Sequence, residues 1–308
     1  MDGTIAQPRP YLALGLRLAA AGALATMTML VKLAGTHGVH LLEMLFWRQA
    51  LTFPLIIAIM YASRRLGDLR TKRPGAHVRR SVYGMTGMVF VYGAVILLPL
   101  AEATTISFTA PLFAVMLSAL LYGDKVGAYR WSAVALGFAG ILIVMRPGGD
   151  MSAVDPLGVL VGLIAAFMVA LISHQLQDLN RTESPWAIVA WFTGLTAPVM
   201  ALALPFVGKS HDLQTWGIIG AMALTGATGQ ILLTSSLRYG HAATIIVMDY
   251  TALLWATFYG WQVFGRLPPA TLAFGAPLIL AAGLVIAWRE RTLARRAKAA
   301  GTADAPTG

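Results

Sequence analysis

Residues 98–148 read LPLAEATTISFTAPLFAVMLSALLYGDKVGAYRWSAVALGFAGILIVMRPG and contain two long apolar runs, 102–122 and 128–146, with a short polar turn between them. Each run has about the 20 residues that a helix needs to cross the hydrocarbon core of a bilayer. Neither run alternates with a period of two, and each is about twice as long as a strand of a membrane barrel. The stretch therefore predicts two membrane-spanning helices joined by a tight turn.

The same pattern continues along the whole chain of 308 residues. Only 12% of the residues are charged and the mean hydropathy is +0.70, whereas a soluble domain carries about 25% charge. The absence of cysteine excludes disulfides, thiol catalysis and cysteine-ligated metal. We expect an all-α membrane protein of ten transmembrane helices, the other eight being 11–34, 39–62, 80–98, 156–177, 185–207, 214–236, 241–264 and 270–288. The first run resembles a secretion signal, but its apolar pattern continues too far, so we expect it to be a membrane helix.

The positions of the basic residues predict the orientation. Of the 23 Lys and Arg residues, 17 flank the spans on one side and three on the other, while Arg17, Lys32 and Arg48 lie inside spans. Cytoplasmic loops carry the excess of positive charge. Both termini are therefore expected in the cytoplasm of a bacterium, with the chain in its inner membrane. Residues 290–308 are expected to form a basic, disordered tail.

An internal repeat divides the chain into 11–148 and 156–289. The motif Ala103–Ile106 opens the fourth span, and the similar motif Ala242–Ile245 opens the ninth. An offset of five spans is odd, so the two halves must cross the membrane in opposite senses. Such inverted repeats are typical of secondary transporters, which bind substrate near the midplane between the halves. In the first half, Pro111 predicts a bend within the fourth span.

The chain resembles the drug/metabolite transporter superfamily, in its ten-helix EamA-type branch. The segments that carry the resemblance are Leu98–Thr104, Ala110–Leu112, Gly137–Gly140, Met145–Gly148, the residues Lys32, Glu43 and Phe46–Arg48, and Asp249–Trp255. One departure is Gly265-Arg266, where many relatives carry Gly-Glu. The resemblance implies proton- or gradient-driven movement of a small amphiphilic metabolite, such as a cofactor, a vitamin, an amino-acid derivative or a metallophore. It implies neither one particular substrate nor a direction of transport.

Aromatic and amide side chains form a candidate substrate-binding wall. Thr251, Trp255, Tyr259 and Gln262 follow one another at helical spacing in the ninth span, and rings aligned in this way can stack on a planar or cationic ligand. The alternative is a stripe that packs against lipid or a neighbouring helix. Further candidate substrate contacts are Gln230 in the eighth span, Tyr83 in the third and Phe108 in the fourth.

Ionisable groups inside spans are candidates for coupling or gating, because charge is costly in the membrane. Asp249 lies about eight residues into the ninth span and could carry protons, or could be paired with Arg or Lys across a helix contact. Lys32 and Glu43 lie at one membrane level and could form a gating pair or simply fix two helices. Arg48 is expected to face a cavity or a carboxylate. His174 could titrate near neutrality or be merely hydrogen-bonded.

Two other functional classes are an intramembrane enzyme and a passive channel or facilitator. The sequence has no Gly-x-Ser-x-Gly or His-Glu-x-x-His motif, so we expect no enzyme, no catalytic residue, no cofactor and no metal site. A passive channel or facilitator remains the main alternative, although an inverted repeat favours alternating access. The expected partners are a small-molecule substrate and membrane lipid, not nucleic acid; a homodimer is left open.

Overall fold

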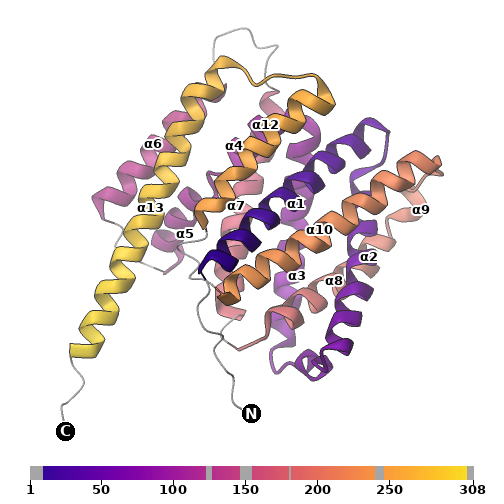
Figure 1. The fold of residues 1–308 in the computed structure, drawn as a ribbon, viewed down its shortest axis with the longest axis horizontal. Helices are drawn as coiled ribbons and strands as arrows, with labels where there is room; N and C mark the ends of the chain where they lie inside the picture. Colours follow the sequence, from indigo (N-terminus) through magenta and orange to yellow (C-terminus); the bar gives the residue numbers. More distant parts are fainter. Residues whose placement is uncertain (1–9, 123–126, 146–154, 180–181, 240–245, 304–308) are drawn as a thin grey trace.

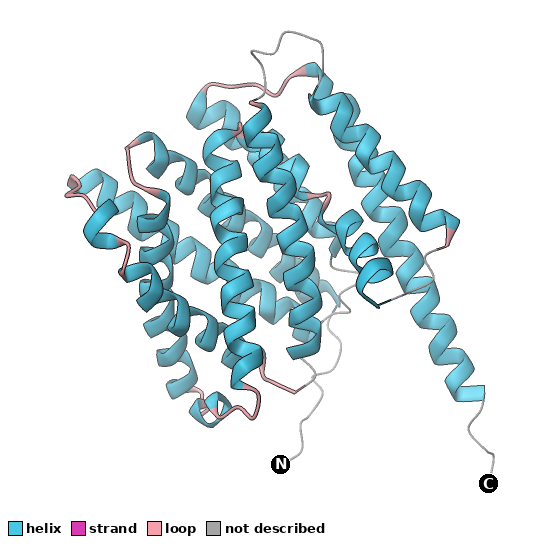
Figure 2. Ribbon diagram, turned by 180° about the vertical axis from the view of Figure 1, so that it is seen from behind, coloured by secondary structure: helices cyan, strands magenta, loops and turns pink. Residues whose placement is uncertain are grey.

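The computed structural model describes residues 10–122, 127–145, 155–179, 182–239 and 246–303, and the regular elements of these residues are all helices (Figures 1 and 2). The motif at 242–245, predicted to open the ninth span, lies outside the described residues, as do 123–126 and 146–154. The first half of the chain contains α1 (Pro10–Thr36), α2 (Leu41–Ala62), η1 (Leu66–Leu69), α3 (Pro74–Leu97), α4 (Leu100–Ser107), α5 (Ala110–Tyr122) and α6 (Ala128–Met145). The second half contains α7 (Pro156–Leu179), α8 (Pro185–Ala201), α9 (Leu204–Val207), α10 (Leu213–Tyr239), η2 (Ile246–Tyr250), α12 (Thr251–Phe264) and α13 (Ala270–Ala303).

Local sequence explains where several helices begin and end. Ser184 precedes α8, and its hydroxyl accepts a hydrogen bond from the backbone amide of Ala187, which would otherwise have no partner. Pro185 follows at the first helical position, where its missing amide hydrogen costs nothing. After α12 the chain turns at Gly265, whose φ of 62° lies in the left-handed region that glycine adopts without strain.

The helices pack into one bundle. The closest pairs are α1 with α10, α3 with α7, α2 with α8, and α6 with α13, so each pair joins a helix of the first half to one of the second. Helix α1 begins, and α13 ends, at the end of the bundle where η1 lies, which is the lower end in Figure 1.

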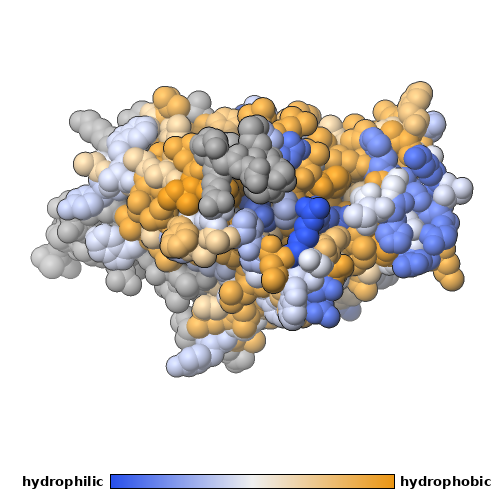
Figure 3. Space-filling view, turned by 90° about the horizontal axis from the view of Figure 1, so that it is seen from above, coloured by the Kyte–Doolittle hydropathy of each residue, from blue (hydrophilic) through white to orange (hydrophobic). Residues whose placement is uncertain are grey.

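Many large apolar side chains point outward, as expected for a protein whose solvent is lipid. Leu254, Phe274 and Leu224 are all more than 60% exposed, and Figure 3 shows extensive hydrophobic surface interrupted by hydrophilic patches. By length and composition, six of the described helical segments could cross a membrane: Tyr11–Thr36, Leu41–Ala62, Pro74–Leu97, Leu100–Leu117, Pro156–Leu176 and Leu213–Leu233. Shorter apolar helices lie at Trp131–Val144, Pro185–Ala201 and Ala270–Ile286.

The structure differs from the sequence-based expectation in two respects. The fourth predicted span is divided into α4 and α5, and the ninth contains the short η2 before α12. The tail was expected to be disordered from residue 290, but α13 continues as a helix to Ala303. The Ala-, Arg- and Lys-rich composition of that segment explains the difference, because all three residue types favour helix.

Candidate functional site

The first feature of the site is a break in the helix of the fourth span. Helix α4 ends at Ser107 and α5 begins at Ala110. Pro111 has no amide hydrogen to donate to the carbonyl of Ser107, which is four residues earlier, so the regular ladder cannot continue. The hydroxyl of Thr109 instead donates to the carbonyl of Ile106 at 2.7 Å. The predicted bend at Pro111 is therefore a change from one helix to another.

The corresponding place in the second half is also irregular, because a 3₁₀ helix, η2, directly precedes α12. The offset that aligns Ala103 with Ala242 places the first break, at 108–109, on residues 247–248, which lie within η2 directly before α12. The hydroxyl of Thr251, the first residue of α12, donates to the carbonyl of Met248 at 2.6 Å. At each of these places, then, a threonine hydroxyl satisfies a carbonyl three residues earlier. Helices α4 and α12 are in direct contact.

A cavity of about 280 Å³ lies between these two segments. Its walls come from α1, α3, α4, α7, α10, η2 and α12 and are mostly small and apolar. Polar atoms enter it from Thr28, Thr104, Ser107 and Asp249. The apolar part of the wall consists of Ala21, Leu24, Ala25, Val91, Ala94, Val95, Leu100, Ala103, Phe108, Gly162, Ala165, Ala166, Val169, Leu233, Ala252 and Ala256. A mainly apolar cavity with a few polar groups is typical of small-molecule sites. We call it the central cavity.

Asp249 is the acidic residue of the central cavity, and it is paired with Arg17 of α1. The Nε and Nη2 atoms of Arg17 donate to the two carboxylate oxygens at 2.6 and 2.5 Å. The Arg17 side chain is only 10% exposed, whereas that of Asp249 is 35% exposed. The carboxylate is therefore held on one side by a buried guanidinium and remains accessible on the other. The sequence left two alternatives for Asp249, a proton carrier or an ion pair across a helix contact. The ion pair is present in the structure, and the role as proton carrier stays a prediction.

Two aromatic rings connect the end of α4 with the start of α12. Phe108, one of the residues expected to contact substrate, follows α4 and lies in the wall of the central cavity. Its ring meets the ring of Tyr250 edge-on, with centroids 5.1 Å apart. Tyr250 precedes α12 directly. A change in the angle between α4 and α12 would therefore alter this ring contact.

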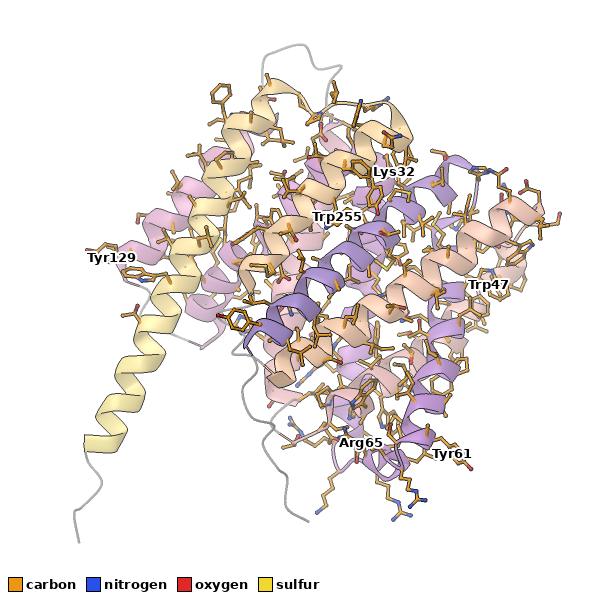
Figure 4. All side chains as sticks on the ribbon, in the orientation of Figure 1. Lys32, Trp47, Tyr61, Arg65, Tyr129 and Trp255 are labelled. Carbon is orange, nitrogen blue, oxygen red and sulfur yellow. The ribbon has the colours of Figure 1, made fainter. Side chains whose placement is uncertain are left out.

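The aromatic stripe of the ninth span lies on a different face of α12. Trp255 is 38% exposed and packs over Gly22 of α1, the helix beside which α12 lies (Figure 4). The Tyr259 ring stacks on Trp255, and its hydroxyl hydrogen-bonds the hydroxyl of Thr26 at 2.7 Å. Gln262 is exposed, and none of these residues belongs to the described wall of the central cavity. This position favours the packing alternative for the stripe.

Lys32 and Glu43 have partners other than each other. The ammonium of Lys32 donates to the carbonyls of Val95, Ile96 and Leu98 at 2.7–3.2 Å, and so neutralises the negative end of α3. It also lines a second cavity of about 220 Å³ together with Glu102 and Arg266. The carboxylate of Glu43, which is buried, lies 2.9 Å from Nε2 of His211.

The remaining candidates lie towards the end of the bundle that carries η1. Arg48 and Gln230 line a third cavity, of about 190 Å³, between α2, α3, α7, α8 and α10. His174 contacts the carbonyl of Ala114 at 3.3 Å, which joins α7 to α5. Tyr83 is half-buried on α3 and lies outside the described walls of the cavities.

Sequence reasoning missed Arg17 as the partner of Asp249, although the signal was present. Arg17 lies about six residues into the first predicted span and Asp249 about eight residues into the ninth, both counted from the end with the basic loops. Two opposite charges at one depth in a membrane are expected to pair. Comparing the depths of the charged residues in all spans would therefore have found the pair.

The chain is similar to known membrane transporters along most of its length. The model of the EamA-like transporter family matches residues 12–146 and again 156–288. A riboflavin transporter of Rhizobium johnstonii is 28% identical over 82% of each chain. A pseudopaline exporter of Pseudomonas aeruginosa is 24% identical over 79% of this chain and 85% of its own. An S-adenosylmethionine uptake transporter of Rickettsia prowazekii is 23% identical over 84% of this chain and 87% of its own. A solved crystal structure has the same fold, with a TM-score of 0.62 at 21% identity, covering 91% of this chain and 98% of that one.

Proposed function

Because the chain belongs to the EamA-like transporter family, we propose that it is a secondary active transporter that moves a small amphiphilic metabolite across the cytoplasmic membrane by alternating access. The observation that carries the proposal is the central cavity, which lies beside the break between α4 and α5 and beside the 3₁₀ segment η2 at the equivalent point of the repeat. Discontinuous helices at equivalent points of two repeats are the usual position of a transporter binding site. The relatives are named for riboflavin, pseudopaline and S-adenosylmethionine, three polar metabolites with apolar parts.

The proposal includes two inverted five-helix repeats, and the pairing of helices supports it. Exchanging the halves maps α1 onto α7, α2 onto α8, α3 onto α10, α4–α5 onto η2–α12, and α6 onto α13. Under this exchange the contact of α1 with α10 becomes that of α7 with α3, and the contact of α2 with α10 becomes that of α8 with α3. The contacts α2–α8 and α6–α13 map onto themselves, and the contact of α1 with α12 becomes that of α7 with α5. All of these contacts are present, as expected for a two-fold axis between the halves.

Two carboxylate–histidine pairs support the same symmetry. Glu43, at the start of α2, lies 2.9 Å from His211, just before α10. Glu183, just before α8, lies 3.7 Å from His77, near the start of α3. Each pair thus joins the second helix of one half to the third helix of the other, at opposite ends of the bundle. Symmetry-related contacts at both ends of the bundle suit a protein in which the two ends open alternately.

Asp249 is the proposed coupling group. Protonation of its carboxylate would weaken the hydrogen bonds from Arg17 and so loosen α1 from η2. Substrate and proton would then act on the same helix contact. A passive facilitator is the alternative, and it predicts no dependence on a gradient. Accumulation of substrate in vesicles with an imposed proton gradient separates the two, and saturable counterflow separates either of them from a channel.

We propose that both termini are cytoplasmic, and the absence of cysteine makes this simple to test. Lys72 and Lys209 are both exposed and lie in connections on opposite sides of the predicted membrane. In right-side-out vesicles, a membrane-impermeant maleimide should label Lys209→Cys and should label Lys72→Cys only after lysis. Labelling in the reverse order would overturn the orientation and, with it, the assignment of inner and outer ends.

Phe108 is expected to contact substrate, and Trp255 serves as the matched aromatic control. Loss of a ring that a ligand covers costs about 1.5–3 kcal/mol, so Phe108→Ala should raise the apparent substrate constant about tenfold or more. Trp255→Ala should leave that constant nearly unchanged, because its ring packs over Gly22 outside the cavity wall. Transport kinetics per folded molecule measure both. A large effect of Trp255→Ala with none of Phe108→Ala would restore the stripe as the binding wall.

The substrate itself is best sought by a metabolite screen. Cells with and without the gene would be compared for uptake and for efflux, with riboflavin, S-adenosylmethionine and a metallophore among the compounds. A compound that accumulates or disappears only with the gene, and only with an energised membrane, identifies the substrate and the direction. If the purified protein moves no member of such a screen, the proposed function fails.

A further inference from the structure

The third cavity contains two arginine side chains from neighbouring helices, Arg48 of α2 and Arg80 of α3. In the described part of the chain, Nε of Arg48 and both Nε and Nη1 of Arg80 are buried without a hydrogen-bond partner. One other nitrogen of Arg48, Nη1, contacts the sulfur of Met88 at 3.2 Å, which is a weak acceptor. Buried guanidinium donors without acceptors are costly, so this arrangement calls for a ligand that supplies acceptors.

The charged side chains in the described lining of this cavity are both cationic. The described lining consists of Arg48, Arg80 and otherwise neutral side chains, among them Gln49, Thr52, Thr193 and Gln230. Gln49 is engaged with Thr196 at 2.8 Å. The nearest ion pairs of α7 and α8 lie at the end of the bundle, where Asp178 binds Arg73 and Glu183 faces His77. A second cation beside the first is unfavourable unless an anion enters.

Arg80 does not behave like an orienting residue of the membrane boundary. The preceding residue, Arg79, is exposed, as expected for a charge that reaches the surface. The Arg80 side chain turns inward instead, and its guanidinium lies over the Phe192 ring of α8 at 4.5 Å. Arg80 also lines the cavity beside this ring contact, and a guanidinium is the side-chain group suited to bidentate binding of an oxyanion.

The third cavity adjoins the central cavity, because Val91 of α3 and Val169 of α7 line both. A volume of about 190 Å³ holds one small polar group of a metabolite, with the rest of the molecule in the central cavity. We propose that Arg48 and Arg80 form an oxyanion subsite that binds the carboxylate or phosphate group of the transported metabolite. This inference rests on the proposed function, and it restricts the substrate to metabolites with such a group.

The test uses purified protein with three probes: succinate, its uncharged dimethyl ester, and inorganic phosphate. Thermal stability is measured for the unaltered chain, for Arg48→Gln and Arg80→Gln, and for the exposed neighbour variant Arg79→Gln. Succinate should stabilise the unaltered chain and Arg79→Gln, while its ester should not. Each cavity variant should lose at least tenfold in apparent affinity. Stabilisation by phosphate in place of succinate would assign the oxyanion as phosphate.

Several results would overturn the subsite. The first is that succinate stabilises the two cavity variants as much as the unaltered chain. The second is stabilisation by the dimethyl ester. The third is no stabilisation by either anion at the highest soluble concentration. If Arg48→Gln or Arg80→Gln fails to fold, the lysine variants keep the charge but lose the bidentate fork, and they should still bind more weakly. A chain that transports a metabolite without an oxyanion, unaffected by these variants, would overturn the subsite but leave the transporter. Arginine-dependent anion binding without any transport would support the subsite and overturn the proposed transporter.

Discussion

Asp249→Asn is expected to abolish gradient-driven transport while the variant still binds substrate. An amide has the shape of the carboxylate but cannot take up and release a proton. We expect a loss of about a hundredfold or more in the gradient-driven rate, which corresponds to about 2.8 kcal/mol. The measurement is concentrative transport in vesicles with an imposed proton gradient, beside substrate exchange without a gradient. Exchange should survive, because the cavity wall is otherwise intact.

Arg17 makes this experiment decisive, since loss of Asp249 also leaves its partner without a countercharge. Breaking a fully buried ion pair costs about 3–5 kcal/mol. Because the Asp249 side chain is 35% exposed, the cost should be lower here, about 1–3 kcal/mol. The double variant Arg17→Gln with Asp249→Asn removes both charges and should recover stability. If the double variant also recovers gradient-driven transport, the pair is purely structural and the coupling group lies elsewhere.

Much of the fold could be predicted because lipid imposes simple rules on a sequence. Apolar runs of about 20 residues identified membrane helices that the structure contains, such as α1, α3 and α7. The interruption of the fourth span was visible in Pro111. The 3₁₀ segment η2 in the ninth span was not, because no proline marks it. There the backbone is held by Thr251 and Tyr250, and threonine hydroxyls bond to backbone carbonyls in regular helices as well.

The site was harder to predict, because a helix presents several faces and the sequence does not state which one lines a cavity. Aromatic side chains drew attention to the face of Trp255, yet the wall is formed by the small residues Ala252 and Ala256 with Asp249. Small residues leave space for a ligand, but they also line close helix contacts, so the sequence alone does not identify them as a cavity wall. Lys32 and Glu43 share a membrane level, but Lys32 binds carbonyls at the end of α3 and Glu43 contacts His211 before α10, which the sequence alone does not bring near.

Filling the central cavity is expected to stop transport altogether, whatever the coupling ion. Ala252→Trp places an indole in a cavity of about 280 Å³ whose wall includes Ala252. Overpacking of a tight interior costs about 1–3 kcal/mol, but here the ring enters empty space, so we expect a folded protein. Transport should fall at least tenfold, and substrate should no longer stabilise the variant.

Leu254→Trp is the matched control, because Leu254 lies two residues further along α12 and is 71% exposed towards the lipid. The same indole on that face should leave transport and substrate stabilisation unchanged. Thermal stability of both variants shows that any difference comes from the cavity and not from the helix. Full transport by Ala252→Trp would mean that substrate does not pass through the central cavity. The route would then have to be sought in the cavity of Lys32, Glu102 and Arg266 at the other end of α4 and α12.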